Sequence, residues 1–269
     1  MPFARQAYLD RLGMKEAPAG IAGLRGLQAS FMSRIPFENI DPLLGQIPSL
    51  ALEDLQEKLI HGRRGGYCFE LNALFGAALQ DFGYRPATLL ARVRNGAAEG
   101  GARMHQAFVV PESGREWLVD VGFGGPGSVW PLDLSEEAPQ EAPNGTYRIR
   151  FDAAFNETVV ERAQGETWLA LYGFDRVPVR PIDLEAANHL AATWSRAPFR
   201  THLMMARHGE DGRTTLFNRK VNDGGTSRIL SEPAELVAVL AERFDLELPR
   251  ELTDALWSKI RNAPTDRPS

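Results

Sequence analysis

Residues 63–72 read RRGGYCFELN and lead directly into the most regular helical pattern of the chain. That pattern is an apolar stripe with the spacing of one helix face, and Gly83 ends it. Its members are Leu71, Leu74, Phe75, Ala78, Leu79 and Phe82. Two glycines, Gly65 and Gly66, give the backbone conformational freedom just before the helix. The segment therefore predicts that Cys68 lies in the first turn of this helix.

Cys68 is the only cysteine of the chain, and its expected position suggests a chemical role. The N-terminus of a helix favours an anion through its unpaired N–H groups and the positive end of its dipole. A thiolate is stabilised there and becomes a usable nucleophile. Arg63 and Arg64 are expected to add positive potential nearby. The alternative at this point is a small buried cysteine without chemistry, because free cysteine is among the most buried residue types.

A cysteine nucleophile needs a base, and the base needs a group that orients it. The five histidines are His61, His105, His189, His202 and His208. Only His105 begins a convincing strand, which continues to Val110. A short loop then leads to a second strand-like run, 117–123. His105 is therefore the candidate base.

The predicted hairpin also places a carboxylate near His105. Paired residue numbers in an antiparallel hairpin have a constant sum, so a turn in which Pro111 faces Gly114 puts Asp120 directly opposite His105. Opposed side chains share a face, with Cβ atoms about 4.5–5.5 Å apart. Asp120 can then hold the imidazole in one tautomer and stabilise its charged form. A purely structural His–Asp pair is the alternative.

Around this centre the chain reads as helical, then β, then mixed α/β. A helical pattern at Leu52–Leu59 stops near Gly62, and short strand-like runs bounded by Gly, Pro and Asn begin at about residue 84. These runs are Thr88–Val93, His105–Val110, Trp117–Phe123, Tyr147–Phe151, Thr158–Glu161 and Trp168–Tyr172. Their spacing indicates a barrel or a sandwich. Ser135–Gly145 is predicted to be a loop, because it contains two prolines. Helices are predicted at Leu184–Trp194 and Ala234–Phe244, with a strand at Thr214–Val221 between them.

Composition excludes several classes of protein. The 269 residues are 43% apolar and 24% charged, which is typical of a globular chain. A net charge of −5 with interspersed signs argues against a nucleic-acid partner. One cysteine allows neither an intrachain disulfide nor a four-thiolate zinc site, and we expect no metal. No apolar run approaches the roughly 18–20 residues of a membrane span, and the N-terminal residues lack a signal pattern. We therefore expect a cytoplasmic protein without a membrane partner.

Taken together, the motifs resemble those of the arylamine N-acetyltransferases. The resemblance rests on the segment Arg64–Asn72, on His105, and on the run from Asp120 to Gly124. Ile35–Ile40 and Pro198–His202 support it. These motifs extend from residue 35 to about residue 202, and the first is highly specific.

The resemblance implies an α+β fold with a cysteine protease-like triad. Residues 1–83 would form a helical domain that carries the nucleophile, residues 84–182 a β-barrel domain with the histidine and aspartate, and residues 183–269 an α/β lid domain. The catalytic triad would be Cys68, His105 and Asp120. The reaction would be ping-pong transfer of an acetyl group from acetyl-CoA, through acetyl-cysteine, to the nitrogen of an arylamine, arylhydrazine or N-hydroxyarylamine. Acetyl-CoA would be a cosubstrate, with no tightly bound cofactor.

Three phenylalanines are candidates for the acceptor pocket: Phe37, Phe123 and Phe199. The alternative for each is packing in the core. Two other activities would use the same Cys-His-Asp triad: a thiol hydrolase, and an amide synthase that takes a carrier-bound acyl chain. A binding protein with a vestigial triad is the non-enzyme alternative. The sequence indicates neither the physiological amine nor the oligomeric state.

Overall fold

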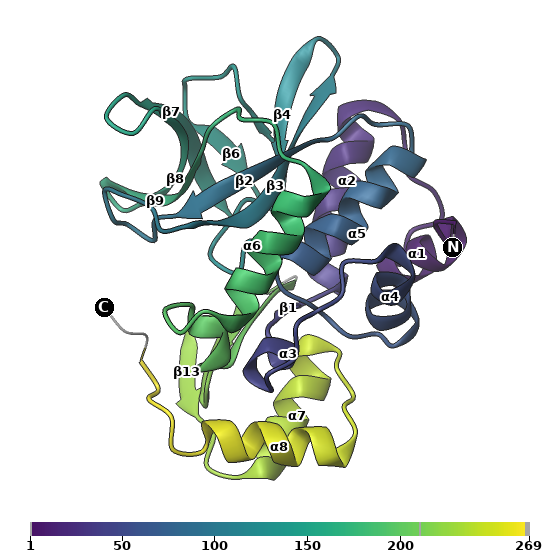
Figure 1. The fold of residues 1–269 in the computed structure, drawn as a ribbon, viewed down its shortest axis with the longest axis vertical. Coiled ribbons are helices and arrows are strands. Elements are labelled where there is room, and N and C mark those ends of the chain that lie inside the picture. Colours follow the sequence, from purple (N-terminus) through teal and green to yellow (C-terminus); the bar gives the residue numbers. More distant parts are fainter. Residues whose placement is uncertain (1, 210, 267–269) are drawn as a thin grey trace.

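The computed structural model describes residues 2–209 and 211–266, and its N-terminal part is helical as predicted. The apolar stripe forms α5 (Cys68–Asp81), which packs against α2 (Gly20–Arg34). Phe75 and Phe31 meet edge to face at that contact, with ring centroids 5.3 Å apart. The remaining helices are α1 (Arg5–Leu12), α3 (Ile40–Leu43) and α4 (Leu52–Gln56), which continues as one π-helical turn, Glu57–His61. Figure 1 shows α1, α2, α4 and α5 gathered on one side of the molecule, whereas α3 lies beside the C-terminal helices.

Eight antiparallel strands form a nearly closed barrel sheet, so the barrel prediction is confirmed. Their order in the sheet is β5-β4-β3-β2-β9-β8-β7-β6. They are β2 (Ala87–Val93), β3 (Arg103–Glu112), β4 (Arg115–Val119), β5 (Leu132–Asp133), β6 (Gln140–Ala142), β7 (Gly145–Asp152), β8 (Glu157–Gln164) and β9 (Thr167–Phe174). Inward residues such as Leu89, Ala107 and Phe174 form a separate apolar core inside this sheet. The opposite face of β3 packs on α5 and α6 (Pro181–Thr193), which joins the barrel to the C-terminal part (Figure 1).

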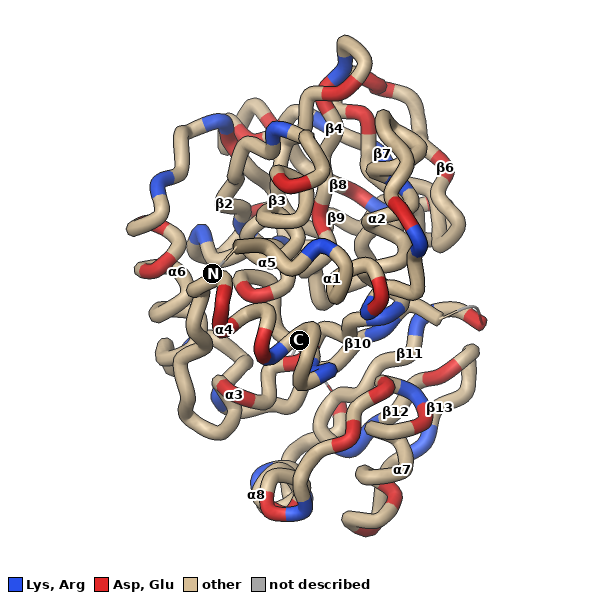
Figure 2. Tube along the Cα trace, turned by 90° about the vertical axis from the view of Figure 1, so that its right-hand side faces the viewer, with Lys and Arg blue, Asp and Glu red and all other residues tan. Residues whose placement is uncertain are grey.

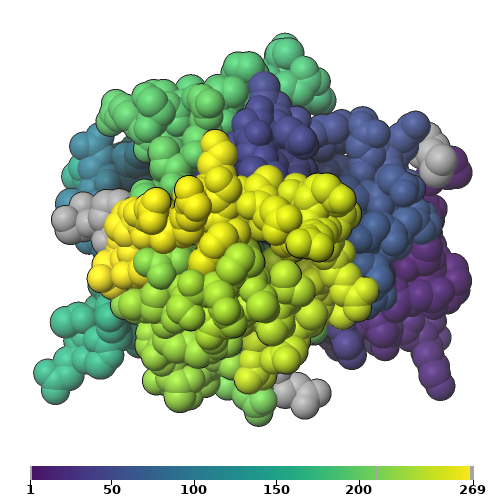
Figure 3. All heavy atoms as spheres, turned by 90° about the horizontal axis from the view of Figure 1, so that it is seen from below, coloured from purple at the N-terminus to yellow at the C-terminus, as the bar shows by residue number. Residues whose placement is uncertain are grey.

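The C-terminal part contains a second antiparallel sheet, β1-β10-β11-β12-β13. Its strands are β1 (Phe37–Glu38), β10 (Met204–Gly209), β11 (Gly212–Phe217), β12 (Lys220–Asp223) and β13 (Thr226–Ile229). Helices α7 (Pro233–Phe244) and α8 (Arg250–Ile260) pack on it through a third apolar core, which also includes Ile40 and Leu43 of α3. Figure 3 shows α8 forming the lower face of the molecule, beside the N-terminal segment that contains α3. One strand of this sheet thus comes from the N-terminal helical part of the chain.

Three local predictions were wrong. The predicted strand Thr214–Val221 is two strands, β11 and β12, because the backbone turns at Asn218, which has a φ of +50°. The predicted loop Ser135–Gly145 contains the short strand β6. The strand predicted to reach Phe123 ends at Val119. The proposed domain boundaries fall after α5 and inside α6.

The predicted hairpin register was also wrong, by two residues. Pro111 pairs with Glu116 rather than Gly114. The turn consists of Ser113 and Gly114 alone, with φ values of +52° and +74°, as two-residue hairpin turns with primed geometry require. Asp120 therefore does not stand directly opposite His105. Because the error is an even number of residues, His105 and Asp120 still point to the same face of the sheet.

On the side drawn in Figure 2, acidic and basic residues are interspersed over both parts of the molecule. Within residues 2–209 and 211–266, no helix is both long and apolar enough to cross a bilayer. The same ranges contain no cluster of three His, Cys, Asp or Glu side chains arranged to hold a metal ion.

Candidate active site

Cys68 is the first residue of α5, as the sequence predicts. The tight approach of two segments explains the glycines before it: a Cβ at Gly65 would overlap the carbonyl oxygen of Pro36. Neither Gly65 nor Gly66 has a positive φ, so space rather than an unusual conformation requires them. The Glu70 carboxylate accepts a hydrogen bond from the Tyr67 N–H at 3.1 Å and so caps the helix. The thiol is 4% exposed and donates to the Met104 carbonyl oxygen at 3.6 Å.

The barrel brings His105 and Asp120 together beside this thiol. The Nε2 atom of His105 lies 2.7 Å from Oδ2 of Asp120, and both side chains are buried. The other carboxylate oxygen, Oδ1, accepts hydrogen bonds from the Asn72 amide at 3.1 Å and from the Gly122 N–H at 2.9 Å. Because Nε2 of His105 contacts Asp120, the other ring nitrogen, Nδ1, is the one available to Cys68. Asn72 lies one turn after Cys68 on α5, so the helix that carries the thiol also fixes the carboxylate.

The pKa shifts of this pair oppose the effect of burial. Burial disfavours the imidazolium, but the charge and hydrogen bond of Asp120, together with Cys68, raise the pKa of His105 to about 10. Burial likewise favours the neutral acid at Asp120, but His105, Asn72 and the Gly122 N–H lower the pKa of that carboxyl. Both directions favour an imidazolium–carboxylate pair at neutral pH.

Arg63 and Arg64 do not supply free positive charge to the thiol, contrary to the sequence prediction. Arg63 pairs with Asp245 at 2.7 Å. Arg64 binds Glu38 at 2.7 Å and Asp41 at 2.9 Å. The charge of each arginine is thus matched by carboxylates from other elements.

Arg64 belongs to a partly buried ion network of five residues: Glu38, Asp41, Lys58, Arg64 and Glu70. Lys58 connects its two halves, because its ammonium lies 2.7 Å from Asp41 and 2.6 Å from Glu70. The network holds three acids and two bases. Burial raises the pKa of Glu70 to about 7, and Glu38 adds to that shift, while Lys58 opposes it.

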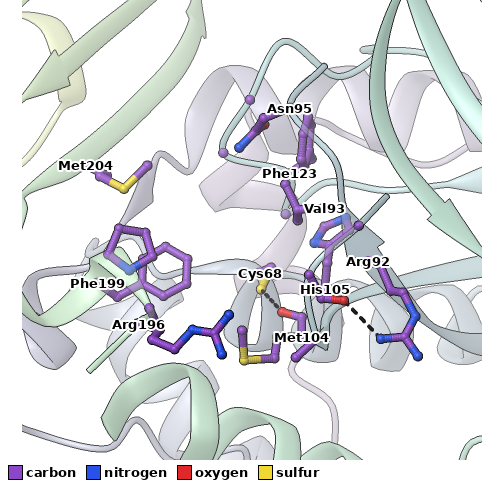
Figure 4. A pocket seen from close by; sticks show the side chains of 18 of the residues that line it. Cys68, Arg92, Val93, Asn95, Met104, His105, Phe123, Arg196, Phe199 and Met204 are labelled. Atoms are coloured by element: carbon purple, nitrogen blue, oxygen red, sulfur yellow. Dashed lines mark hydrogen bonds between the residues drawn. The ribbon is translucent and has the colours of Figure 1, made fainter. Parts of the chain in front are cut away.

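A cavity of about 630 Å³ opens onto Cys68 and His105. All three predicted pocket residues, Phe37, Phe123 and Phe199, line it. Figure 4 shows Phe123 and Phe199 on different sides of Cys68. Phe37 and Phe199 face each other with ring centroids 6.3 Å apart, whereas Phe123 packs against the His105 ring at 5.3 Å. The three rings therefore occupy two different environments, one at the wall of the cavity and one against the imidazole.

Sequence reasoning missed several residues of this site. Arg196, Trp194 and Met104 also line the cavity, and Tyr172 packs on His105 at 4.9 Å. Burial and then Asp120 raise the pKa of Tyr172 well above its usual value, so this phenol stays neutral. Tyr172 lies on β9, far along the chain from His105, and the sequence contains no pattern that links the two. Asn72 lies in the motif that supported the resemblance, but its bond to Asp120 had no sequence signal.

Known proteins are similar to this chain over most of its length. A model of the N-acetyltransferase family matches residues 20–253. The arylamine N-acetyltransferase / N-hydroxyarylamine O-acetyltransferase of Salmonella typhimurium is 38% identical over 217 residues, covering 79% of this chain and 76% of the relative.

Two solved structures cover nearly the whole chain. The arylamine N-acetyltransferase from Salmonella typhimurium matches with a TM-score of 0.88 at 32% identity, over 94% of this chain and 97% of the other. The arylamine N-acetyltransferase of Mycobacterium marinum, solved in complex with CoA, has the same TM-score at 32% identity, over 95% and 99% of the two chains.

Proposed function

The chain belongs to the arylamine N-acetyltransferase family, and from that premise we propose that it moves an acetyl group from acetyl-CoA to an arylamine, arylhydrazine or N-hydroxyarylamine through an acetyl-Cys68 intermediate. One observation carries the proposal. A buried His105–Asp120 pair, 2.7 Å apart, lies beside a cysteine that opens onto a cavity with phenylalanine rings in its wall. The Mycobacterium marinum relative binds CoA, which supports acetyl-CoA as the donor.

In the first half-reaction Cys68 attacks the thioester carbonyl of acetyl-CoA. The imidazolium of His105 stabilises the thiolate, as histidine–cysteine pairs do elsewhere. Backbone N–H groups at the first turn of α5 face the developing oxyanion, a contribution of about 3–4 kcal/mol in enzymes where it has been measured. The C–S bond to CoA breaks, and His105 gives its proton to the departing thiolate. The enzyme is left with acetyl-Cys68 and a neutral His105.

In the second half-reaction the amine of the acceptor attacks acetyl-Cys68. Neutral His105 accepts a proton from the amine, and Asp120 stabilises the imidazolium that forms. The C–S bond to Cys68 breaks, which releases the amide and restores the thiolate–imidazolium pair. Phe37 and Phe199 form the wall on which an aromatic acceptor ring packs. An aryl contact of this kind contributes about 0.5–1.5 kcal/mol beyond its buried area.

Intact-mass measurement after mixing with acetyl-CoA tests the intermediate. We expect one added acetyl group on the wild type and none on Cys68→Ala or Cys68→Ser, and addition of an aniline should remove the group as the acetanilide. Cys68→Ala that still acetylates an arylamine at a near wild-type rate would refute the mechanism. Release of free acetate with no acetylated amine would identify a thiol hydrolase instead.

A further inference from the structure

Four arginines from separate elements meet between the N-terminal helical part and the C-terminal sheet, and we call them the arginine group. They are Arg11 of α1, Arg34 of α2, Arg63 just after the π-helical turn and Arg207 of β10. Figure 2 shows basic residues of separate segments close together beside β10. None of the four lines the active-site cavity, so the chemistry proposed above does not use them.

Two members of the arginine group share one carboxylate, that of Asp245, which directly follows α7. Its Oδ2 atom lies 3.4 Å from Nη1 of Arg11 and 2.7 Å from Nη2 of Arg63. Arg11 also donates a hydrogen bond to the carbonyl oxygen of Arg63 at 3.4 Å. The side chain of Arg11 is 1% exposed and that of Arg63 is 59% exposed. The group therefore extends from a buried guanidinium out to the solvent.

Arg34 and Arg207 add two cations that have no carboxylate of their own. The guanidinium of Arg34 lies against Gly13, which follows α1, because a Cβ at Gly13 would be 3.5 Å from its Nη2. Nε of Arg207 donates to the carbonyl oxygen of Ser33 at 2.8 Å, and its Nη1 donates to that of Arg243 at 3.2 Å. Within residues 2–209 and 211–266, no carboxylate oxygen lies within 4.0 Å of a nitrogen of either guanidinium.

The arginine group thus holds four positive charges and pairs with one carboxylate. Burial lowers the pKa of Arg11 to about 10, and the charges of Arg63, Arg207 and Arg34 add to that shift, while Asp245 opposes it. Burial also lowers the pKa of Arg207, with Arg34 and Arg63 acting in the same direction. Each guanidinium is therefore destabilised by its neighbours, and an anion among them would relieve the repulsion.

We propose that the arginine group is a second ligand site, separate from the active site, which binds the phosphate group of a small soluble molecule. Guanidinium forks match phosphate oxygens in pairs. Four cations, one carboxylate and a phosphate dianion leave a net charge of about +1, so the dianion is not repelled. A free phosphate is favoured over a lipid headgroup, because the buried Arg11 lies below the surface that a flat bilayer would touch. The ligand would join α1 and α2 to β10 and so stabilise the fold.

Calorimetric titration of the full chain with inorganic phosphate tests the site. We expect one saturable site in the wild type and a Kd about tenfold weaker in Arg34→Gln, a typical loss for a charge-assisted contact. Asp245→Asn should change the Kd in the other direction, by about tenfold, because it removes the anion that competes with phosphate. Asparagine tolerates the φ of +55° at position 245, so this variant keeps the backbone. Arg85→Gln is the matched control, because Arg85 is an exposed arginine outside the arginine group.

Thermal unfolding gives a second readout for variants that fold less well. Phosphate also stabilises proteins by exclusion from their surface, so the rise in Tm over that in chloride at equal ionic strength is compared between variants. At a phosphate concentration about ten times the Kd, binding should add about 3–5 °C to the Tm of the wild type and of Arg85→Gln. The rise should be smaller in Arg34→Gln and larger in Asp245→Asn.

Sedimentation with phosphatidylglycerol vesicles separates the two sources of phosphate. We expect the wild type to stay in the supernatant. Vesicle binding that Arg34→Gln abolishes, without saturable binding of inorganic phosphate, would overturn the inference in favour of a lipid surface. Equal Kd values in the wild type, Arg34→Gln and Asp245→Asn would overturn the site itself. Neither measurement depends on acetyl transfer, so a wild type that forms no acetyl-Cys68 would overturn the proposed function alone.

Discussion

Two charged groups flank the first turn of α5, one of them buried and the other partly buried, and only one of them reaches the cavity. On one side, the His105–Asp120 pair is fixed by Asn72, and its histidine lines the cavity. On the other side, the five-residue ion network joins α5 to β1, α3 and the π-helical turn, and none of its members lines the cavity. Similar ion pairs at similar distances thus have different consequences. The first is placed to exchange protons with substrate, and the second to hold the segment that carries Cys68.

Asp120→Asn should produce the largest effect on chemistry. It keeps the shape of the side chain but removes the charge that stabilises imidazolium, so the rate of Cys68 acetylation should fall by about 10²–10⁴-fold, as for orienting residues of other triads. Stopped-flow acetylation with acetyl-CoA measures the rate. Asp133→Asn is the control, because Asp133 is a buried, ion-paired aspartate of the same sheet that lies outside the cavity. An Asp120→Asn variant that keeps most of the acetylation rate would show that the His105–Asp120 pair has only a structural role.

Glu38→Gln should instead lower the stability of the fold and leave the rate of chemistry nearly unchanged. It removes the fully buried partner of Arg64, which keeps Asp41 at 2.9 Å, so the free energy of unfolding should fall by about 1–3 kcal/mol. The folded fraction should keep acetylation rates near those of the wild type, because the network does not touch the cavity. Urea unfolding measures the loss. Glu116→Gln, in an exposed pair with Arg176, should cost less than about 0.5 kcal/mol. Equal unfolding curves for the two variants would contradict a supporting role for the network.

The pH dependence of stability separates the two groups further. The pKa of Glu70 is raised from 4.5 to about 7, so between these values the folded chain binds the proton more tightly than the unfolded chain does. Stability from Glu70 is therefore present below pH 4.5 and is lost as the pH rises through 7. At 1.36 kcal/mol per unit the loss is about 3 kcal/mol.

Unfolding of the wild type and of Glu70→Gln at several pH values tests this sign. The stability of the wild type relative to Glu70→Gln should decline across the window from 4.5 to 7, whereas Glu116→Gln should parallel the wild type. A relative stability that stays flat from pH 4.5 to 7 would mean that Glu70 is already ionised throughout that range and is stabilised by Lys58.

The smallest expected effect concerns the aromatic residues. Phe199→Ala should raise the KM of an aromatic acceptor by about tenfold and largely spare acetylation by acetyl-CoA, because the Phe199 ring packs on Phe37 and Tyr67 rather than on His105. Phe123→Ala should slow both half-reactions, because Phe123 packs on His105. Phe151→Ala, at a ring that is 63% exposed, is the control. Identical profiles for Phe123→Ala and Phe199→Ala would show that the two rings share one role.

Much of this site follows from local sequence patterns. The position of Cys68 followed from helix periodicity and two glycines, and the shared face of His105 and Asp120 survived an error in register because the error was even. The ion network could not be predicted, because it joins Glu38, Lys58 and Glu70 through contacts that no periodicity encodes. Strand β1 is two residues long, too short for any alternation, and its partner Ala206 lies far along the chain. Arg196 reaches the cavity from a loop. A loop has no helix or strand periodicity, so the sequence does not predict where its side chains point.

Strand β1 also has a mechanical consequence. Phe37 pairs with Ala206 of β10 on one side and bridges to Gly66 on the other, and Glu38 donates its N–H to Gly66 at 2.8 Å. Gly66 is two residues from Cys68, so the backbone pairing of β1 connects β10 to the segment that carries the nucleophile. A swing of the whole C-terminal sheet would carry the nucleophile with it. The mouth of the cavity is bordered by two exposed segments outside this coupling: the loop that contains Arg196 and the turn that contains Glu99.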